Sequence, residues 1–162
     1  MTSNNELIVT WLKDAYSMET GIAEVLEKQV NATTDTPMVQ QGIQRHLEAT
    51  RGHAETVKGC LESLGESPSG LKAGMAGIGG KIQGMMMGMP EDSLVKFALM
   101  DYSTEHMEIA SYKALIVAAE DAGLTQVAEA CKGILRDEEQ MAAWLDQQLP
   151  MAVRETVAQA AA

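Results

Sequence analysis

The sequence predicts an all-α protein, an antiparallel four-helix bundle built from two helical hairpins joined by one long connection. Apolar residues recur at alternating steps of three and four along four long segments, which keeps one face of each helix apolar. The composition agrees, because Ala, Leu, Met and Val carry the apolar fraction and only 4% of the residues are aromatic. A chain of 162 residues is expected to form a single domain over residues 1–162.

The first hairpin is predicted from two amphipathic segments separated by a short turn. The first segment runs from about Asn5 to Asn31. Thr36 is expected to cap the second helix and Pro37 to occupy its first position, where a missing backbone N–H costs nothing. The second helix is expected to stop at Gly65.

The second hairpin has the same plan. Its first helix is expected to open near Pro90, with acidic residues placed favourably against the helix dipole, and to continue to Asp121. A tight turn at Gly123 leads into the last helix, which is expected to end at Pro150. The Ala-rich tail, about residues 151–162, is expected to be a short helix or frayed.

The connection between the hairpins, about residues 66–89, is long and has an unusual composition. From Gly70 to Pro90 it holds seven glycines and five methionines. Methionine can bind soft metals, but it more often fills gaps in a core, and packing is the favoured interpretation. A single long crossover between two hairpins is the ferritin-like bundle topology.

Charge and targeting signals narrow the class of function. The net charge of −11 and the pI near 4.6 argue against a nucleic-acid surface or an anionic membrane patch, which both need clustered Lys and Arg. No run of about 18 uncharged apolar residues is present, and the N-terminus lacks the pattern of a secretion signal. Cys60 and Cys131 are expected to be buried, reduced thiols. The expected location is the cytoplasm.

One short motif, Tyr-Ser-x-Glu, occurs twice, as Tyr16-Ser-Met-Glu19 and as Tyr102-Ser-Thr-Glu105. Each copy places a carboxylate within the apolar stripe of the first helix of a hairpin. Burying an ionised carboxylate costs several kcal/mol unless it is paired or bound to a metal. The repeat therefore indicates where the function resides.

Further acids are predicted to converge at the same level of the bundle. Glu108 follows Glu105 on the inward face, and Glu138 lies on the inward face of the last helix. A hairpin that turns near residue 122 places residue 138 level with residue 106. Like charges only a few Å apart cannot all ionise, and a bound cation is the simplest resolution.

The second helix offers His46, Glu48 and His53. At about 100° per residue, both histidines lie at the edge of the apolar stripe, whereas Glu48 points away from it. The spacing favours His46 or His53 as the nitrogen ligand of a metal site and argues against Glu48.

Three stretches, His46-Leu-Glu-Ala-Thr50, Glu105-His-Met-Glu-Ile-Ala-Ser-Tyr112 and Asp137-Glu-Glu-Gln-Met-Ala-Ala-Trp144, resemble the YciE/YciF-type ferritin-like proteins of bacteria. The resemblance covers all four predicted helices. It implies a stress-associated four-helix bundle, often a homodimer, with a di-metal centre of iron or manganese in its core. On motif match it also implies the ligand candidates Glu19, His46, Glu48, Glu105, Glu108 and Glu138.

Two functions remain open from the sequence. The first is a di-iron or di-manganese centre that reacts with oxygen or peroxide, with Tyr16 and Tyr102 as its hydrogen-bonding or electron-donating neighbours. The second is a non-catalytic, stress-related structural or interaction bundle. No histidine lies three residues after Glu138 or Glu48, where Met141 and Arg51 stand. These departures favour a site dominated by carboxylates, or a partial loss of metal binding.

Overall fold

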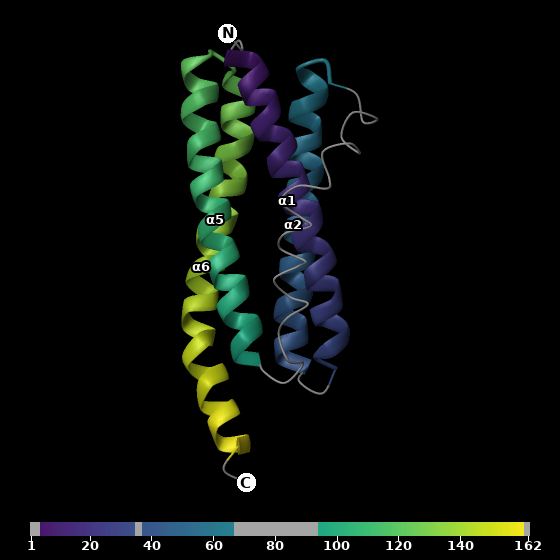
Figure 1. Ribbon diagram of the computed structural model, residues 1–162, viewed down its shortest axis with the longest axis vertical. Coiled ribbons are helices and arrows are strands. Elements are labelled where there is room, and N and C mark those ends of the chain that lie inside the picture. The colour runs from purple at the N-terminus through teal and green to yellow at the C-terminus, as the bar shows by residue number, and fades with distance from the viewer. Residues whose placement is uncertain (1–3, 35–36, 67–93, 161–162) are drawn as a thin grey trace.

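The computed structural model describes residues 4–34, 37–66 and 94–160, and these form four helices (Figure 1). They are α1 (Asn4–Ala32), α2 (Pro37–Ser63), α5 (Leu94–Asp121) and α6 (Thr125–Ala160). The prediction of an all-α four-helix bundle is confirmed. None of the described helices is long and apolar enough to cross a membrane.

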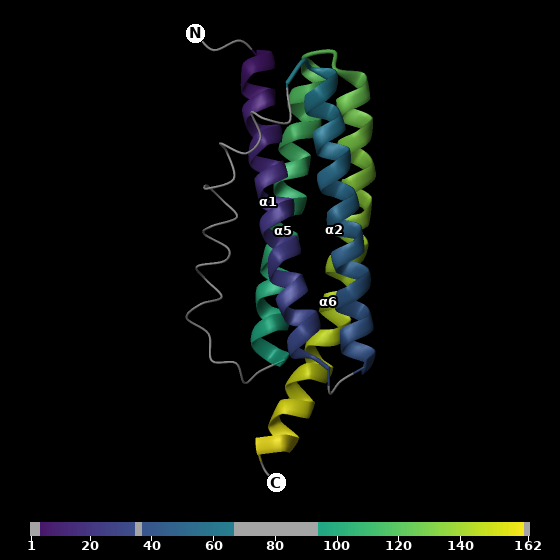
Figure 2. The ribbon, with the colours of Figure 1, turned by 90° about the vertical axis from the view of Figure 1, so that its right-hand side faces the viewer.

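The helices pack as two hairpins. Contacts are densest within the pairs α1–α2 and α5–α6, and the hairpins meet through α1 with α5 and α2 with α6. In both views α2 ends and α5 begins at opposite ends of the bundle (Figures 1 and 2), so α2 and α5 run in the same direction. That direction is the one expected for a ferritin-like bundle with a long crossover. The predicted crossover itself, the opening near Pro90 and the Thr36 cap lie outside the described residues.

Glycines end α2 and α5 at the predicted places. Gly65 and Gly123 have φ values of 85° and 71°, a left-handed conformation in which a side chain would be strained. In each turn the following residue donates a backbone hydrogen bond to the carbonyl five positions earlier: Glu66 to Leu61 at 3.0 Å and Leu124 to Ala119 at 2.8 Å. This pattern satisfies the last carbonyls of the helix.

The prediction that the last helix ends at Pro150 is wrong. α6 continues through Pro150 to Ala160, and its final turns project beyond the other three helices and lean across the end of the bundle (Figure 2). Proline removes one hydrogen bond and crowds the preceding turn, which bends a helix without always ending it. The residues after Pro150 are mostly good helix formers, so the helix resumes.

The bundle core contains the apolar stripes that the sequence indicates. Buried apolar side chains from all four helices form one cluster, which includes Leu12, Leu26, Leu61, Leu115 and Cys131. Cys60 and Cys131 are both buried free thiols, as predicted. The same apolar layers enclose a cluster of buried polar side chains.

A buried carboxylate and histidine cluster

All four helices contribute side chains to one polar cluster in the core. Each member is buried, with at most 6% of its surface exposed. α1 supplies one carboxylate, α2 two imidazoles, α5 two carboxylates and α6 one carboxylate. The cluster consists of Glu19, His46, His53, Glu105, Glu108 and Glu138.

The carboxylates form two groups that share Glu138. Glu19, His53 and Glu138 each offer a ligand atom within 4.8 Å of the others. Glu105, Glu108 and Glu138 form a second group by the same measure. Glu138 therefore lies at the same height in the bundle as Glu105 and Glu108, as predicted. Each group can hold a metal ion, and Glu138 lies where it can touch both.

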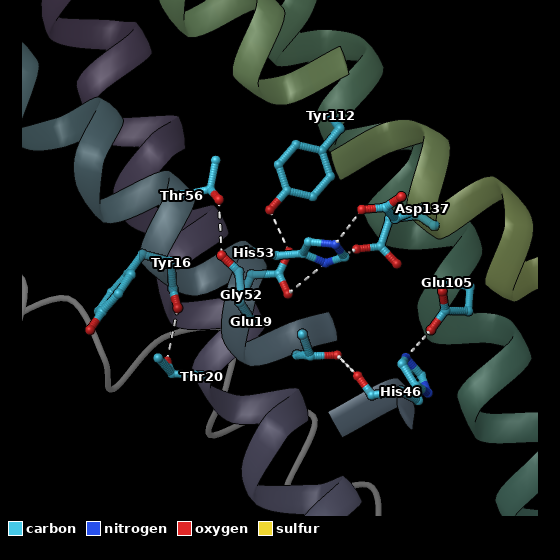
Figure 3. Close-up of polar contacts among 12 residues, drawn as sticks. Tyr16, Glu19, Thr20, His46, Gly52, His53, Thr56, Glu105, Tyr112 and Asp137 are labelled. Atoms are coloured by element: carbon cyan, nitrogen blue, oxygen red, sulfur yellow. Dashed lines mark hydrogen bonds and ion pairs between the residues drawn. The ribbon is translucent and has the colours of Figure 1, made fainter. Parts of the chain in front are cut away.

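The two imidazoles contact different carboxylates of the cluster. His46 Nε2 lies 2.7 Å from Glu105 Oε1. His53 Nδ1 lies 2.8 Å from Glu138 Oε1 and 3.8 Å from Glu19 Oε2, while its Nε2 lies 3.3 Å from Asp137 (Figure 3). The sequence left the choice between His46 and His53 open, and the structure brings both histidines into the cluster.

Most polar atoms of the cluster have no hydrogen-bond partner. Within the described part of the chain, ten buried side-chain atoms are unsatisfied, and eight belong to these six residues. They include both carboxylate oxygens of Glu105 and of Glu108. His46 Nε2 and His53 Nδ1 are among these unsatisfied atoms, whereas His53 Nε2 is hydrogen-bonded with Asp137 at 3.3 Å. Since nearly all buried polar atoms in proteins are satisfied, this concentration requires an explanation, and a bound cation would supply one.

Protonation is the alternative to a cation at this site. Burial, together with the charges of neighbouring carboxylates, raises the pKa of Glu19 to about 8 and that of Glu105 to about 10. The pKa of Glu108 is raised well above its usual value for the same reasons. Burial would lower the pKa of His53, but the adjacent Glu138 carboxylate, with Glu19 and Asp137, raises it to about 9. The pKa of His46 is lowered, chiefly by burial.

Tyr112 contacts the cluster, although the sequence indicates it only as the last residue of the stretch that begins at Glu105 and not as part of the site. Its buried hydroxyl donates a hydrogen bond to Glu19 Oε1, joining α5 to α1 (Figure 3). Burial raises the pKa of Tyr112 well above its usual value, so it remains a donor. Tyr16 and Tyr102, the tyrosines of the repeated motif, are half-buried; the ring of Tyr102 stacks edge-on against exposed His106 at 4.6 Å. Tyr112 lies seven residues, or about two helical turns, after Glu105, so the sequence could have placed both side chains on the same inward face of the helix.

Glu48 is the one candidate that the structure does not bring to the cluster. It is exposed and accepts a hydrogen bond from Gln44 at 3.2 Å. The helical geometry of the sequence had pointed it outward, whereas the motif resemblance had included it. The structure adds a buried neighbour instead: Asp101 accepts a hydrogen bond from Gln29 Nε2 at 2.9 Å. Burial raises the pKa of Asp101 to about 6.

The fold and the cluster together define a class: ferritin-like four-helix bundles that carry a carboxylate and histidine cluster in the core. The chain belongs to the family described as "Domain of unknown function (DUF892)", which matches residues 3–159. The resemblance seen in the sequence is therefore confirmed.

Individual relatives support this assignment. The chain is 28% identical over 146 residues to Protein YciF of Escherichia coli K12, covering 85% of each chain. A Xanthomonas campestris protein of known structure has a TM-score of 0.81 and 30% identity, covering 99% of this chain and 100% of its own. The structure of the E. coli stress protein YciF has a TM-score of 0.76 and 26% identity, covering 95% and 99%. YcfI of Rhodopseudomonas palustris, at 23% identity, shares the fold with a TM-score of 0.71.

Proposed function

We propose that the protein binds two iron or manganese ions in its core and that this centre reacts with oxygen or peroxide as part of a stress response. One ion is assigned to Glu19, His53 and Glu138. The second is assigned to Glu105, Glu108 and Glu138, with His46 as the additional nitrogen donor. Glu138 belongs to both groups and would contribute to holding both ions.

The observation that carries the proposal is the set of buried carboxylate oxygens without hydrogen-bond partners. Four glutamates from three helices lie against one another in the core, and Glu105 and Glu108 have no partner for either oxygen. The described part of the chain places no lysine or arginine against them. A site of four carboxylates and two imidazoles suits iron and manganese, which accept mixed oxygen and nitrogen ligands.

The proposed reactivity follows from the donor set. Two such ions supply redox chemistry and positions for an oxidant. The protein contributes a site enclosed by apolar layers, and Tyr112 fixes the orientation of Glu19 and keeps a proton on its hydroxyl oxygen at neutral pH. The link to stress rests on the relative that is called a stress protein in E. coli.

The test begins with chelator-treated protein, to which Fe²⁺ or Mn²⁺ is added before thermal unfolding. Each ion is expected to raise the melting temperature, because ligands that bind only the folded state stabilise it by mass action. Glu138→Gln should abolish most of this shift. Glu139→Gln, at the adjacent exposed position, is the matched control and should retain it. An equal shift in all three proteins, or no shift in any, would contradict metal binding at this cluster.

A second candidate function, a non-catalytic structural or interaction bundle, is favoured by a different observation. His53 lies between Glu19 and Glu138, and the raised pKa values allow the remaining acids to stay protonated, so the core has a metal-free arrangement. Exposure of the iron-loaded protein to oxygen or hydrogen peroxide separates the two functions. A new visible absorbance band that the Glu138→Gln variant lacks supports the reactive centre. Metal binding without spectral change supports the structural role.

The proposal includes a homodimer in the cytoplasm that binds metal ions and not nucleic acid. Exposed apolar side chains on α5, including Leu99 and Val117, support a self-association surface. Sedimentation velocity of the wild type and of a Leu99→Glu/Val117→Glu variant tests it. The wild type is expected to sediment as a dimer and the variant as a monomer, and a monomeric wild type would contradict the proposal.

A further inference from the structure

A large cavity opens at the end of the bundle where α2 and α5 begin and α6 passes Pro150. Its volume is about 690 Å³, within the range typical of small-molecule sites. Side chains of all three helices line it. The proposed function makes no use of this cavity.

The walls of the cavity are mainly apolar and aromatic. They include Ile43 of α2, Phe97 of α5, and Trp144 and Leu145 of α6. Trp144 is held against α2 because Gly42 lacks a side chain: a Cβ at position 42 would lie 2.6 Å from the indole ring. The tryptophan wall thus depends on a close helix approach that only glycine allows.

Two buried polar groups also line the cavity, His46 and Asp101, which are 4% and 8% exposed. His46 Nε2 lies 2.7 Å from Glu105, so this imidazole borders both the cavity and the carboxylate cluster. A molecule bound against His46 is therefore within one side chain of the proposed metal centre.

The charged groups at the inner end of the cavity determine which polar group of a ligand can bind there. Asp101 presents a carboxylate to the cavity, and Gln29 donates to only one of its oxygens. A group that donates a hydrogen bond is complementary to such a surface, whereas a carboxylate would be repelled. Arg45 and Glu155, both exposed, line the outer part of the cavity with opposite charges.

The geometry points to a binding site for a small amphiphile, with an apolar body in the cavity and a hydrogen-bond-donating end, such as a hydroxyl, hydroperoxide or amine, against His46 and Asp101. That such a molecule is a substrate of the metal centre rests on the proposed function. The binding site itself does not.

The first test uses metal-free protein and three probes of equal chain length: 1-octanol, octylamine and octanoate. Titration followed by NMR should shift the indole N–H of Trp144 and the ring signals of His46 saturably with octanol and octylamine. Octanoate should bind at least tenfold more weakly. Trp11, the other tryptophan of the chain, lies outside this cavity and is the internal control. Absence of saturable binding, equal binding of octanoate, or shifts at Trp11 in place of Trp144 would overturn the inference.

A variant pair repeats the test by blocking the cavity. Ala98→Trp places a large side chain in the cavity, whereas Ala110→Trp places it at an exposed position of the same helix. Octanol affinity should fall at least tenfold in the first variant and stay unchanged in the second, provided that both melt cooperatively. Equal affinity in the two variants would contradict the site, and the wild-type shifts above decide the question if Ala98→Trp does not fold.

The orientation is tested on manganese-loaded protein. The protons next to the hydroxyl of octanol should relax faster than its terminal methyl, because the polar end lies nearer the paramagnetic ions. The reverse order would overturn the orientation. If manganese does not bind, the proposed centre fails, while the probe shifts in the metal-free protein still decide whether the cavity binds amphiphiles.

Discussion

His53 Nδ1 lies 2.8 Å from Glu138 Oε1, joining the last helix of each hairpin across the core. Glu138 also belongs to the group formed with Glu105 and Glu108. The same carboxylate thus faces an imidazole in the metal-free protein and belongs to both candidate metal groups. Protons and metal ions are expected to compete for this cluster.

Glu108→Gln is expected to stabilise the metal-free protein and to weaken metal binding. Both Glu108 oxygens are unsatisfied, no histidine contact is found for it among the described residues, and neighbouring charges raise its pKa. Removing the acid should raise the free energy of unfolding at pH 8 by at least about 1.4 kcal/mol, which corresponds to a pKa raised by one unit, because the buried side chain no longer has to take up a proton on folding. Denaturant unfolding measures the first effect and metal titration the second.

Glu48→Gln is the control for that experiment, since Glu48 is exposed on α2. This substitution should change neither the free energy of unfolding nor that of metal binding by more than about 0.5 kcal/mol. A Glu108→Gln protein that is less stable than the wild type without metal would contradict the account of the cluster.

The metal-free protein is expected to lose stability between pH 6 and pH 9. Glu19 and Glu105 keep their protons up to about pH 8 and pH 10 when folded, but ionise near 4.5 when unfolded. Unfolding then releases protons, so stability falls as pH rises through this range. His53 acts in the same direction, because its raised pKa of about 9 gives stability that is lost as pH rises through that value.

The pH dependence should reverse when metal is bound, since the ligands must be deprotonated and metal affinity rises with pH. Thermal unfolding from pH 6 to pH 9, with and without Mn²⁺, checks both statements. A shift of about 2–4 °C is expected for each kcal/mol. If the melting temperature changed with pH in the same way with and without Mn²⁺, the proposed coupling between proton release and metal binding would be contradicted.

Tyr112→Phe is expected to destabilise the metal-free protein. The hydroxyl is buried and donates to Glu19, so its loss leaves a carboxylate oxygen unsatisfied. The expected cost is about 1–3 kcal/mol. Tyr16→Phe, at a half-buried position of α1, should cost much less. Chemical denaturation of both variants measures the difference, and equal effects would indicate that the Tyr112 hydroxyl contributes little.

Gly42→Ala is expected to force Trp144 away from α2. The added Cβ would lie 2.6 and 2.8 Å from two ring atoms, far inside normal contact distances. Overpacking of this kind costs about 1–3 kcal/mol. Gly52→Ala, where nothing lies within 4 Å, should instead stabilise α2 by up to about 1 kcal/mol. If both substitutions changed the free energy of unfolding in the same direction, the close packing at Gly42 would be contradicted.

Much of the fold could be predicted because its signals are local. The apolar stripes define four helices, and Gly65 and Gly123 end two of them as expected. The prediction failed at Pro150 because a proline ends a helix only where the neighbouring turns are not otherwise stabilised. α6 has good helix formers on both sides and continues.

The polar cluster was partly predictable for a related reason. The inward positions of Glu19, Glu105 and Glu138 follow from helical periodicity, and their common level follows from the hairpin turn. The position of a ring or a hydroxyl depends on rotamers and on the neighbouring helix, which periodicity does not contain. For that reason His46 and His53 could not be distinguished, and the contact of Tyr112 with Glu19 was not foreseen.

The most direct test of the central claim is anomalous diffraction from crystals grown with Mn²⁺. Two peaks are expected in the core, one on each side of Glu138 and about 3.5–4 Å apart. One should lie against Glu19 and His53, and the other against Glu105 and Glu108. Manganese found only at exposed carboxylates, or none in the core at saturating concentration, would contradict the account.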